Sequence, residues 1–169
     1  MLLNGVGYLM NKHVKFIHGD EALLDQIRVL WEALNSHHLG LSTNFKQHYQ
    51  DMTFEKRRAD LLKKAATGKM RVDLAVHKVT GQNVGYCVSS FNQEKIGEVE
   101  SIFVDANYRG MGIGDALMKK TLCWMDQEGA MEKIVEVASG NEEAFCFYSK
   151  YGFLPRKTLL KQMKPSDTC

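Results

Sequence analysis

The sequence lacks the features that would place it in a membrane or on a strongly charged polymer. It has no apolar run long enough to cross a bilayer, and its mildly apolar first ten residues have neither a basic start nor a convincing cleavage site. The formal net charge at pH 7 is only +2, so no strong field attracts nucleic acid or an anionic membrane surface. We therefore expect neither nucleic acid nor a membrane among its partners.

Cysteine is scarce, and no two of the four cysteines have the spacing of a metal site or a redox pair. Cys87, Cys123 and Cys146 lie in apolar patterns and are predicted to be buried thiols, which fits a reducing cytoplasm. Three histidines between residues 36 and 49 have no cysteine or carboxylate pattern beside them, so no metal site is predicted.

Repeats, linkers and low-complexity segments are also absent. A chain of 169 residues with 44% apolar and 25% charged residues suits one globular domain with one core. We predict a single domain over residues 12–164, a disordered N-terminal extension over 1–11 and a frayed end over 165–169. An alternative is that Met10 is the native start and the first nine residues are an upstream extension.

Apolar periodicity predicts an α/β fold with a mixed sheet. The strands are predicted over residues 12–18, 72–77, 84–91, 98–104, 133–138 and 153–162, and the helices over 20–35, 53–66, 112–128 and 141–152. Residues 36–49 are predicted to form a surface connection with short helical turns. The crossover helix makes strands 98–104 and 133–138 parallel, and the other strands are antiparallel, with helices on both faces.

A glycine-rich turn stands at the centre of this pattern. Residues 109–114 read Arg-Gly-Met-Gly-Ile-Gly, between the strand 98–104 and the helix 112–128. A helix N-terminus of this kind presents free N–H groups and a favourable dipole to a phosphate, and Arg109 adds a positive charge. The turn is not a Walker A loop, because Asp115 follows Gly114, and its spacing departs from the dinucleotide fingerprint. A plain strand-to-helix turn is the other interpretation.

The surroundings of the turn are more specific. The pattern Arg-x-x-Gly-x-Gly, preceded by Ile-Phe-Val-Asp-Ala-Asn-Tyr, resembles the acetyl-CoA-binding motif of the GNAT acetyltransferase superfamily. About thirty residues later, Asn141, Ala144, Tyr148 and the pair Gly152 and Phe153 resemble the family's Asn-x-x-Ala-x-x-x-Tyr-x-x-x-Gly-Phe motif. The two motifs cover residues 98–155, about a third of the chain, in the family's order.

The resemblance implies the GNAT fold, with one splayed parallel junction, and acetyl-CoA as the co-substrate without a metal. Strand backbone would bind the pantetheine arm, the turn would hold the pyrophosphate, and the later motif would contact the arm from the far side. The cofactor-binding residues that it implies are Ile102, Phe103, Val104, Arg109, Gly110, Met111, Gly112, Ile113, Gly114, Asp115, Asn141 and Tyr148. The histidine-rich region 36–49 would line the acceptor site.

Acetyl transfer to an amine needs a base, a donor to the thioester oxygen and an acid for the leaving thiolate. Glu98 matches the family's common base position and would act through a water. Glu100, two residues on along the strand, is the second candidate for the base. Alternatively, both carboxylates bind a cationic acceptor, or Glu98 is only a charge at the edge of the strand. A backbone N–H near Ile102 and Phe103 is the expected oxygen donor. Tyr148 matches the family tyrosine that reaches the thioester sulfur, although a packed aromatic is the alternative.

We therefore predict an N-acetyltransferase that moves an acetyl group from acetyl-CoA to a primary amine by direct attack in a ternary complex. The expected partner is a small-molecule amine, and exposed strands near the C-terminus could pair in a homodimer. The alternatives are a non-catalytic acyl-CoA-binding sensor and an enzyme of the same fold that acetylates a protein N-terminus or lysine.

Overall fold

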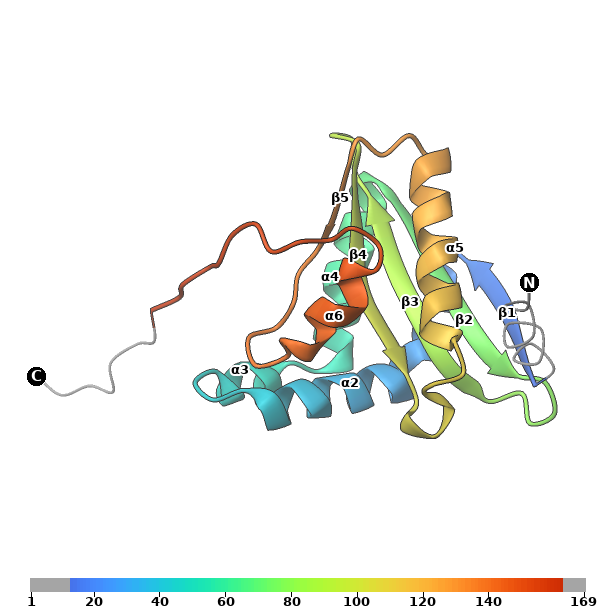
Figure 1. Cartoon of the computed structure of the whole chain (residues 1–169), viewed down its shortest axis with the longest axis horizontal. Helices are drawn as coiled ribbons and strands as arrows, with labels where there is room; N and C mark the ends of the chain where they lie inside the picture. Colours follow the sequence, from blue (N-terminus) through green and yellow to red (C-terminus); the bar gives the residue numbers. More distant parts are fainter. Residues whose placement is uncertain (1–12, 163–169) are drawn as a thin grey trace, which may run out of the picture.

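The computed structural model describes residues 13–162, and its centre is a five-stranded sheet in the order β1-β2-β3-β4-β5 (Figure 1). The first four strands are antiparallel, and β5 runs parallel to β4. The strands are β1 (Val14–Gly19), β2 (Lys69–His77), β3 (Asn83–Phe91), β4 (Ile96–Val104) and β5 (Glu132–Val135). The helical elements are η2 (Glu21–Ile27), α2 (Arg28–Leu41), α3 (Lys46–Asp51), α4 (Phe54–Thr67), η3 (Ala106–Tyr108), α5 (Ile113–Gln127) and α6 (Glu143–Ser149). The predicted α/β fold with one parallel junction is confirmed.

Helices cover both faces of the sheet, and each face has its own apolar core (Figure 1). η2, α2 and α4 pack on one face, where Leu61, Leu74 and Tyr86 are fully buried. α5 lies across the other face, where Ala75 and Leu117 are fully buried. Leu74 and Ala75 are consecutive in β2 yet belong to opposite cores, as the alternation of a strand requires.

The first long helix extends further than the sequence predicted. α2 ends at Leu41 rather than Asn35, so half of the predicted surface connection is helical, and α3 follows it. The physical reason is that the inward stripe of Trp31 and Leu34 continues at the half-buried His38, four positions after Leu34. The helix therefore carries the histidine region against the body of the domain.

α4 begins and ends close to its predicted limits. The Thr53 side chain at its N-cap accepts a hydrogen bond from the N–H of Lys56 at 3.3 Å, and Gly68 is its C-cap. A Cβ at Gly68 would lie 2.3 Å from the carbonyl oxygen of Phe91, so only glycine fits where α4 meets the end of β3. This contact fixes α4 relative to the sheet.

The predicted final strand over residues 153–162 is wrong. This segment has no strand structure and runs away from the sheet (Figure 1). Pro155 cannot donate to a ladder, and Leu154, Leu159 and Leu160 are 77%, 88% and 89% exposed. Leu159 and Leu160 are consecutive, so a strand could not bury both on one face.

The segment before it also differs from the prediction. β5 ends at Val135, three residues early. α6 has Glu142 at its N-cap, so Asn141 does not cap it and lies in the preceding turn, where its carbonyl accepts a hydrogen bond from the N–H of Ala144 at 3.0 Å. Residues 136–141 therefore belong neither to β5 nor to α6.

Of the cysteines predicted to be buried, only Cys87 is, and burial raises the pKa of its thiol to about 12. Cys123 and Cys146 are exposed, because they lie on the outer sides of α5 and α6. The predicted N-terminal extension, the Met10 start and the frayed end lie outside the described residues. Among residues 13–162, no helix is long and apolar enough to cross a membrane.

Candidate active site

A β-bulge in β4 sets the direction of the side chains at the middle of this strand. Two consecutive residues of β3 pair with Ser101 and Val99, so Glu100 between them is an extra residue. A bulge of this kind breaks strict alternation. Glu98 and Glu100 still lie on one face, because both contact Lys64 of α4.

The strands β4 and β5 separate at the bulge. Their parallel pairing ends where Val99 meets Val135, and among the described strands none continues beside residues 100–104 on that side. This edge of β4 can therefore bind an extended ligand as an added strand, apart from the carbonyls of Glu100 and Val104, which accept hydrogen bonds from Arg57 and Arg109.

Two adjoining cavities lie where the strands separate, with volumes of about 70 Å³ and 340 Å³. They share a wall formed by Leu34, His38, Val99, Glu100, Ser101 and residues 136–138. The smaller cavity reaches Ile102, Asn141 and Tyr148, which were predicted as site residues. The larger cavity reaches Glu98, together with Arg57 and Lys64 of α4. The structure thus gathers residues from both predicted motifs around one opening in the sheet.

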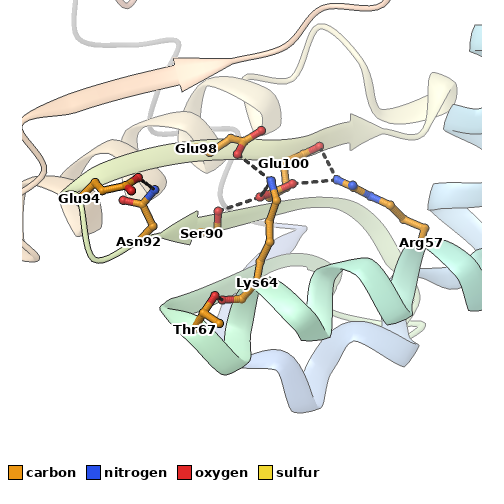
Figure 2. Close-up of polar contacts among 8 residues, drawn as sticks. All are labelled: Arg57, Lys64, Thr67, Ser90, Asn92, Glu94, Glu98 and Glu100. Carbon is orange, nitrogen blue, oxygen red and sulfur yellow. Dashed lines mark hydrogen bonds and ion pairs between the residues drawn. The ribbon is translucent and has the colours of Figure 1, made fainter.

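Glu98 and Glu100 belong to a compact ionic cluster with Lys64, Arg57 and Ser90, the carboxylate cluster (Figure 2). Lys64 reaches from α4 between the two carboxylates, with its Nζ 2.7 Å from Glu98 Oε2 and 2.5 Å from Glu100 Oε1. The guanidinium of Arg57 donates to Glu100 Oε2 at 3.1 Å and to the Glu100 carbonyl at 3.0 Å. The hydroxyl of Ser90 donates to Glu100 Oε1 at 2.7 Å.

The two carboxylates differ in how much of their bonding capacity is used. The Glu100 side chain is 2% exposed, and both of its oxygens accept hydrogen bonds from the cluster. The Glu98 side chain is 22% exposed, lines the larger cavity and accepts a hydrogen bond on Oε2. Glu100 is therefore built in as an anchor, whereas Glu98 keeps access to a molecule in the cavity.

The charges of the carboxylate cluster balance, with two cations facing two carboxylates. Burial opposes the charge of Lys64, but hydrogen bonds to Glu100 and Glu98 outweigh burial and raise its pKa. Lys64 is therefore protonated at neutral pH.

Tyr148 lines the smaller cavity from α6. Its ring packs edge-on against Phe147 and Phe153, with ring centroids 5.3 Å and 6.1 Å away. Burial raises the pKa of Tyr148, so its hydroxyl keeps its proton at neutral pH and is available as a donor.

His38 lines both cavities from the last turn of α2. Its ring lies 5.7 Å from that of Tyr49 and 6.0 Å from that of His37, measured between centroids. Burial, assisted by the charge that His37 can carry, lowers the pKa of His38. The imidazole is therefore neutral at pH 7 and contributes no positive charge to the cavity wall.

The glycine turn lies beyond the far end of β4, after η3. Gly110 and Gly112 have φ angles of 75° and 71°, which favour glycine, and Gly112 is the N-cap of α5. Arg109 Nε donates to the Val104 carbonyl at 3.1 Å, so the guanidinium is held beside the end of β4. The glycine turn lines neither of the two cavities. A ligand that binds both the turn and the cavities must therefore extend along the edge of β4 that β5 leaves uncovered.

Asp115 and Gly114, at the start of α5, contact side chains of the segment that contains α6. Asp115 accepts a hydrogen bond from the Tyr151 hydroxyl at 2.7 Å and pairs with Lys119 at 2.7 Å, and these contacts lower its pKa, the Lys119 hydrogen bond most. Its carboxylate thus ties α6 to the start of α5. A Cβ at Gly114 would be in ordinary contact with Phe147 at 3.5 Å, so its glycine is not required sterically.

Within residues 13–162, no group of three or more histidine, cysteine or acidic side chains is arranged to hold a metal ion.

Comparison with known proteins decides the family. The family model described as Acetyltransferase (GNAT) family matches residues 31–153, which is most of the chain. The chain belongs to the GNAT acetyltransferase family. The predicted family and the predicted GNAT fold are therefore confirmed.

Two relatives match parts of this GNAT domain. It is 35% identical over 86 residues to an uncharacterized N-acetyltransferase of Methanocaldococcus jannaschii, covering 46% of this chain and 37% of the relative. It is 34% identical over 65 residues to N-alpha-acetyltransferase 30 of Schizosaccharomyces pombe, covering 38% of this chain and 43% of the relative. The matches thus span less than half of either relative.

A solved structure of similar fold is aminoglycoside N-acetyltransferase AAC(6')-Iy in complex with CoA. It has a TM-score of 0.65 at 16% identity, with 90% of this chain and 95% of that chain covered. At this identity the likeness shows the fold. That solved structure contains bound CoA.

The motifs did not indicate two members of the carboxylate cluster. Arg57 belongs to a run of four charged residues, 55–58, which is typical of the solvated face of a helix, and Lys64 follows Arg57 by seven positions. Arg57, Leu61 and Lys64 have the spacing of one helix face, and Leu61 is fully buried. This spacing was the signal that both cations turn toward the sheet.

Proposed function

We propose that this GNAT domain is an acetyl-CoA-dependent N-acetyltransferase that acts on a small-molecule primary amine by direct transfer in a ternary complex. The observation that carries the proposal is the separation of β4 and β5 at Val99 and Val135, with cavities at that point lined by Glu98 and Tyr148. A free strand edge, a glycine-rich helix N-terminus and a cavity with acid and base candidates together suit a thioester with a long phosphorylated arm.

The residues present suit the pyrophosphate and the pantetheine arm of such a ligand. The N–H groups at the start of α5 and the Arg109 side chain suit a pyrophosphate. The backbone of β4 at Ile102, Phe103 and Val104, apart from the Val104 carbonyl that Arg109 Nε contacts, suits the amide groups of pantetheine. Asn141, which lines the smaller cavity opposite β4, suits the arm from the other side. The Asp115 carboxylate is engaged by Lys119 and Tyr151, so its contribution is restricted to its backbone N–H.

Glu98 is the proposed base, acting through a water. The amine must lose a proton before it attacks, because an alkylammonium has a pKa of about 10. Glu98 lines the larger cavity with 22% of its side chain exposed, whereas Glu100 is enclosed by Lys64, Arg57 and Ser90. The structure therefore supports Glu98 over Glu100 for this role.

Tyr148 is the proposed acid. The amine nitrogen forms a bond with the carbonyl carbon, the carbon–sulfur bond breaks, and the leaving thiolate takes a proton from the Tyr148 hydroxyl, which is restored through water by the proton that the amine gave to Glu98. Burial raises the pKa of Tyr148, so its hydroxyl is protonated before the reaction begins. A backbone N–H of β4 near Ile102 and Phe103 would donate to the carbonyl oxygen as its charge develops.

A protein acceptor is the second candidate, because one relative is named as an N-alpha-acetyltransferase. A larger acceptor would have to enter through the larger cavity, which α2, α3 and α4 border with His38, Tyr49 and Lys64. A homodimer stays a prediction. The free thiols of Cys87, Cys123 and Cys146 support a reducing compartment such as the cytoplasm.

Two substitutions test the proposal. Tyr148→Phe and Glu98→Gln should each lower kcat for amine acetylation by about 10²-fold or more, while the Kd for acetyl-CoA stays within about twofold. CoA release across a panel of amines measures the first quantity, and calorimetry measures the second. Binding of acetyl-CoA without acetylation of any amine or peptide would favour a non-catalytic sensor.

A further inference from the structure

Lys64 occupies a position that the acceptor would need. Its Nζ is an alkylammonium group that lines the larger cavity and lies 2.7 Å from Glu98, the carboxylate with access to that cavity. A second alkylammonium that bound Glu98 Oε2 would have to replace this one, because the Lys64 ammonium lies against that oxygen (Figure 2).

We propose that Lys64 is a displaceable internal occupant of the acceptor ammonium site, and that the acceptor is an unbranched primary alkylamine that takes its place beside Glu98. This inference rests on the proposed function and adds the substrate class and a specificity-determining residue. Lys64 carries a primary amine on a four-carbon chain, so the space that it fills has the shape and charge of such an acceptor.

The surroundings of Lys64 allow it to leave. Its side chain is 43% exposed, so its flexible stem can carry the charge into solvent. When it leaves, Glu100 still accepts hydrogen bonds from Arg57 at 3.1 Å and from Ser90 at 2.7 Å, so this buried carboxylate stays paired. Within the carboxylate cluster, Glu98 contacts only Lys64. When Lys64 leaves, Glu98 is therefore the carboxylate that can pair with the incoming ammonium.

The charge of Lys64 determines how strongly it competes with the acceptor. Lys64 is protonated at neutral pH, because its hydrogen bonds to Glu100 and Glu98 outweigh the opposing effect of burial and raise its pKa. The acceptor must therefore compete with a bound cation. The partly exposed pair with Glu98 alone contributes up to about 1 kcal/mol, which corresponds to about a fivefold weakening of acceptor binding, and the pair with the buried Glu100 adds to this cost.

Lys64→Met tests this inference, with Lys63→Met as the matched control. Lys63 is the preceding residue of α4, is 77% exposed and pairs with Asp60 outside the cavity. For butylamine and 1,4-diaminobutane, we expect Lys64→Met to lower KM by at least about threefold and to tighten amine binding, measured by calorimetry with CoA present, by the same factor. Lys63→Met should change neither, and the branched tert-butylamine should gain less than butylamine from Lys64→Met.

The outcomes separate the inference from the proposed function. An unchanged or raised KM and Kd for the linear amines in Lys64→Met would overturn the inference while wild-type turnover upholds the function. If the wild type acetylates no amine, the function fails, and the amine Kd still tests displacement of Lys64. Lys64→Gln, which keeps a polar but uncharged end on a shorter stem, supplies the same comparison if Lys64→Met does not fold.

Discussion

Exchanging each glutamate of β4 for glutamine should separate an anchor from a base. Glu100→Gln removes the charge that Lys64, Arg57 and Ser90 share, whereas Glu98→Gln removes a single contact with Lys64. The shape of both side chains is kept. We expect Glu100→Gln to act mainly on stability and Glu98→Gln mainly on turnover.

The magnitudes follow from exposure. Breaking a buried ion pair costs about 3–5 kcal/mol. Glu100 is 2% exposed, but Arg57 and Lys64 are 24% and 43% exposed, so water compensates part of the loss. We therefore expect a loss of about 2–3 kcal/mol for Glu100→Gln. The more exposed pair of Glu98 should cost less than about 1 kcal/mol.

Calorimetric unfolding and steady-state kinetics measure the two effects. For a chain of this length, 1 kcal/mol corresponds to about 2–4 °C in Tm, so Glu100→Gln should lower Tm by about 4–12 °C and Glu98→Gln by less than about 4 °C. Glu98→Gln should lower kcat by about 10²-fold or more. The reasoning is refuted if Glu100→Gln loses as much kcat as Glu98→Gln while its Tm is unchanged.

Three further predictions concern the rest of the fold. Gly68→Ala should destabilise the protein by at least about 2 kcal/mol, since its Cβ would lie 2.3 Å from the Phe91 carbonyl oxygen. Gly40→Ala should raise stability by about 0.5 kcal/mol, because Gly40 lies in α2 with open space around it. Denaturant unfolding of both variants checks this. The lowered pKa of His38 means that the unfolded chain binds more protons below about pH 6.5, so stability should fall with acidification, and His38→Gln should reduce that fall between pH 7 and 5 in calorimetric scans. Arg109→Ala should raise the Kd for acetyl-CoA about tenfold by calorimetry and change Tm by less than about 2 °C; an unchanged Kd would remove Arg109 from the pyrophosphate site.

Local patterns were sufficient to predict the centre of the fold. The alternation in β2 and β3, the glycines before α5 and the Thr53 cap of α4 are effects of neighbouring residues, so they can be read along the chain. The same holds for Glu98 and Tyr148, whose positions follow from their motifs, although their roles stay proposals.

Features that depend on distant contacts were missed or misjudged. The bulge at Glu100 shows only in the register between β3 and β4, and the pairing of Arg57 and Lys64 with the two glutamates joins positions more than thirty apart. α2 continues past Asn35 because its inward stripe continues, which outweighs the weak helix propensity of that stretch. Residues 153–162 were predicted as an antiparallel strand beside the strand 133–138, but that strand ends at Val135 and the segment does not join the sheet.

The most direct test of the central claim combines acetyl-CoA binding with amine acetylation by the purified chain. Calorimetry should show one acetyl-CoA site per chain with a micromolar Kd. A panel of primary amines should release CoA and give an N-acetylated product by mass spectrometry without an acetylated enzyme intermediate. Failure to bind acetyl-CoA, or transfer through an acetylated enzyme, would contradict the account.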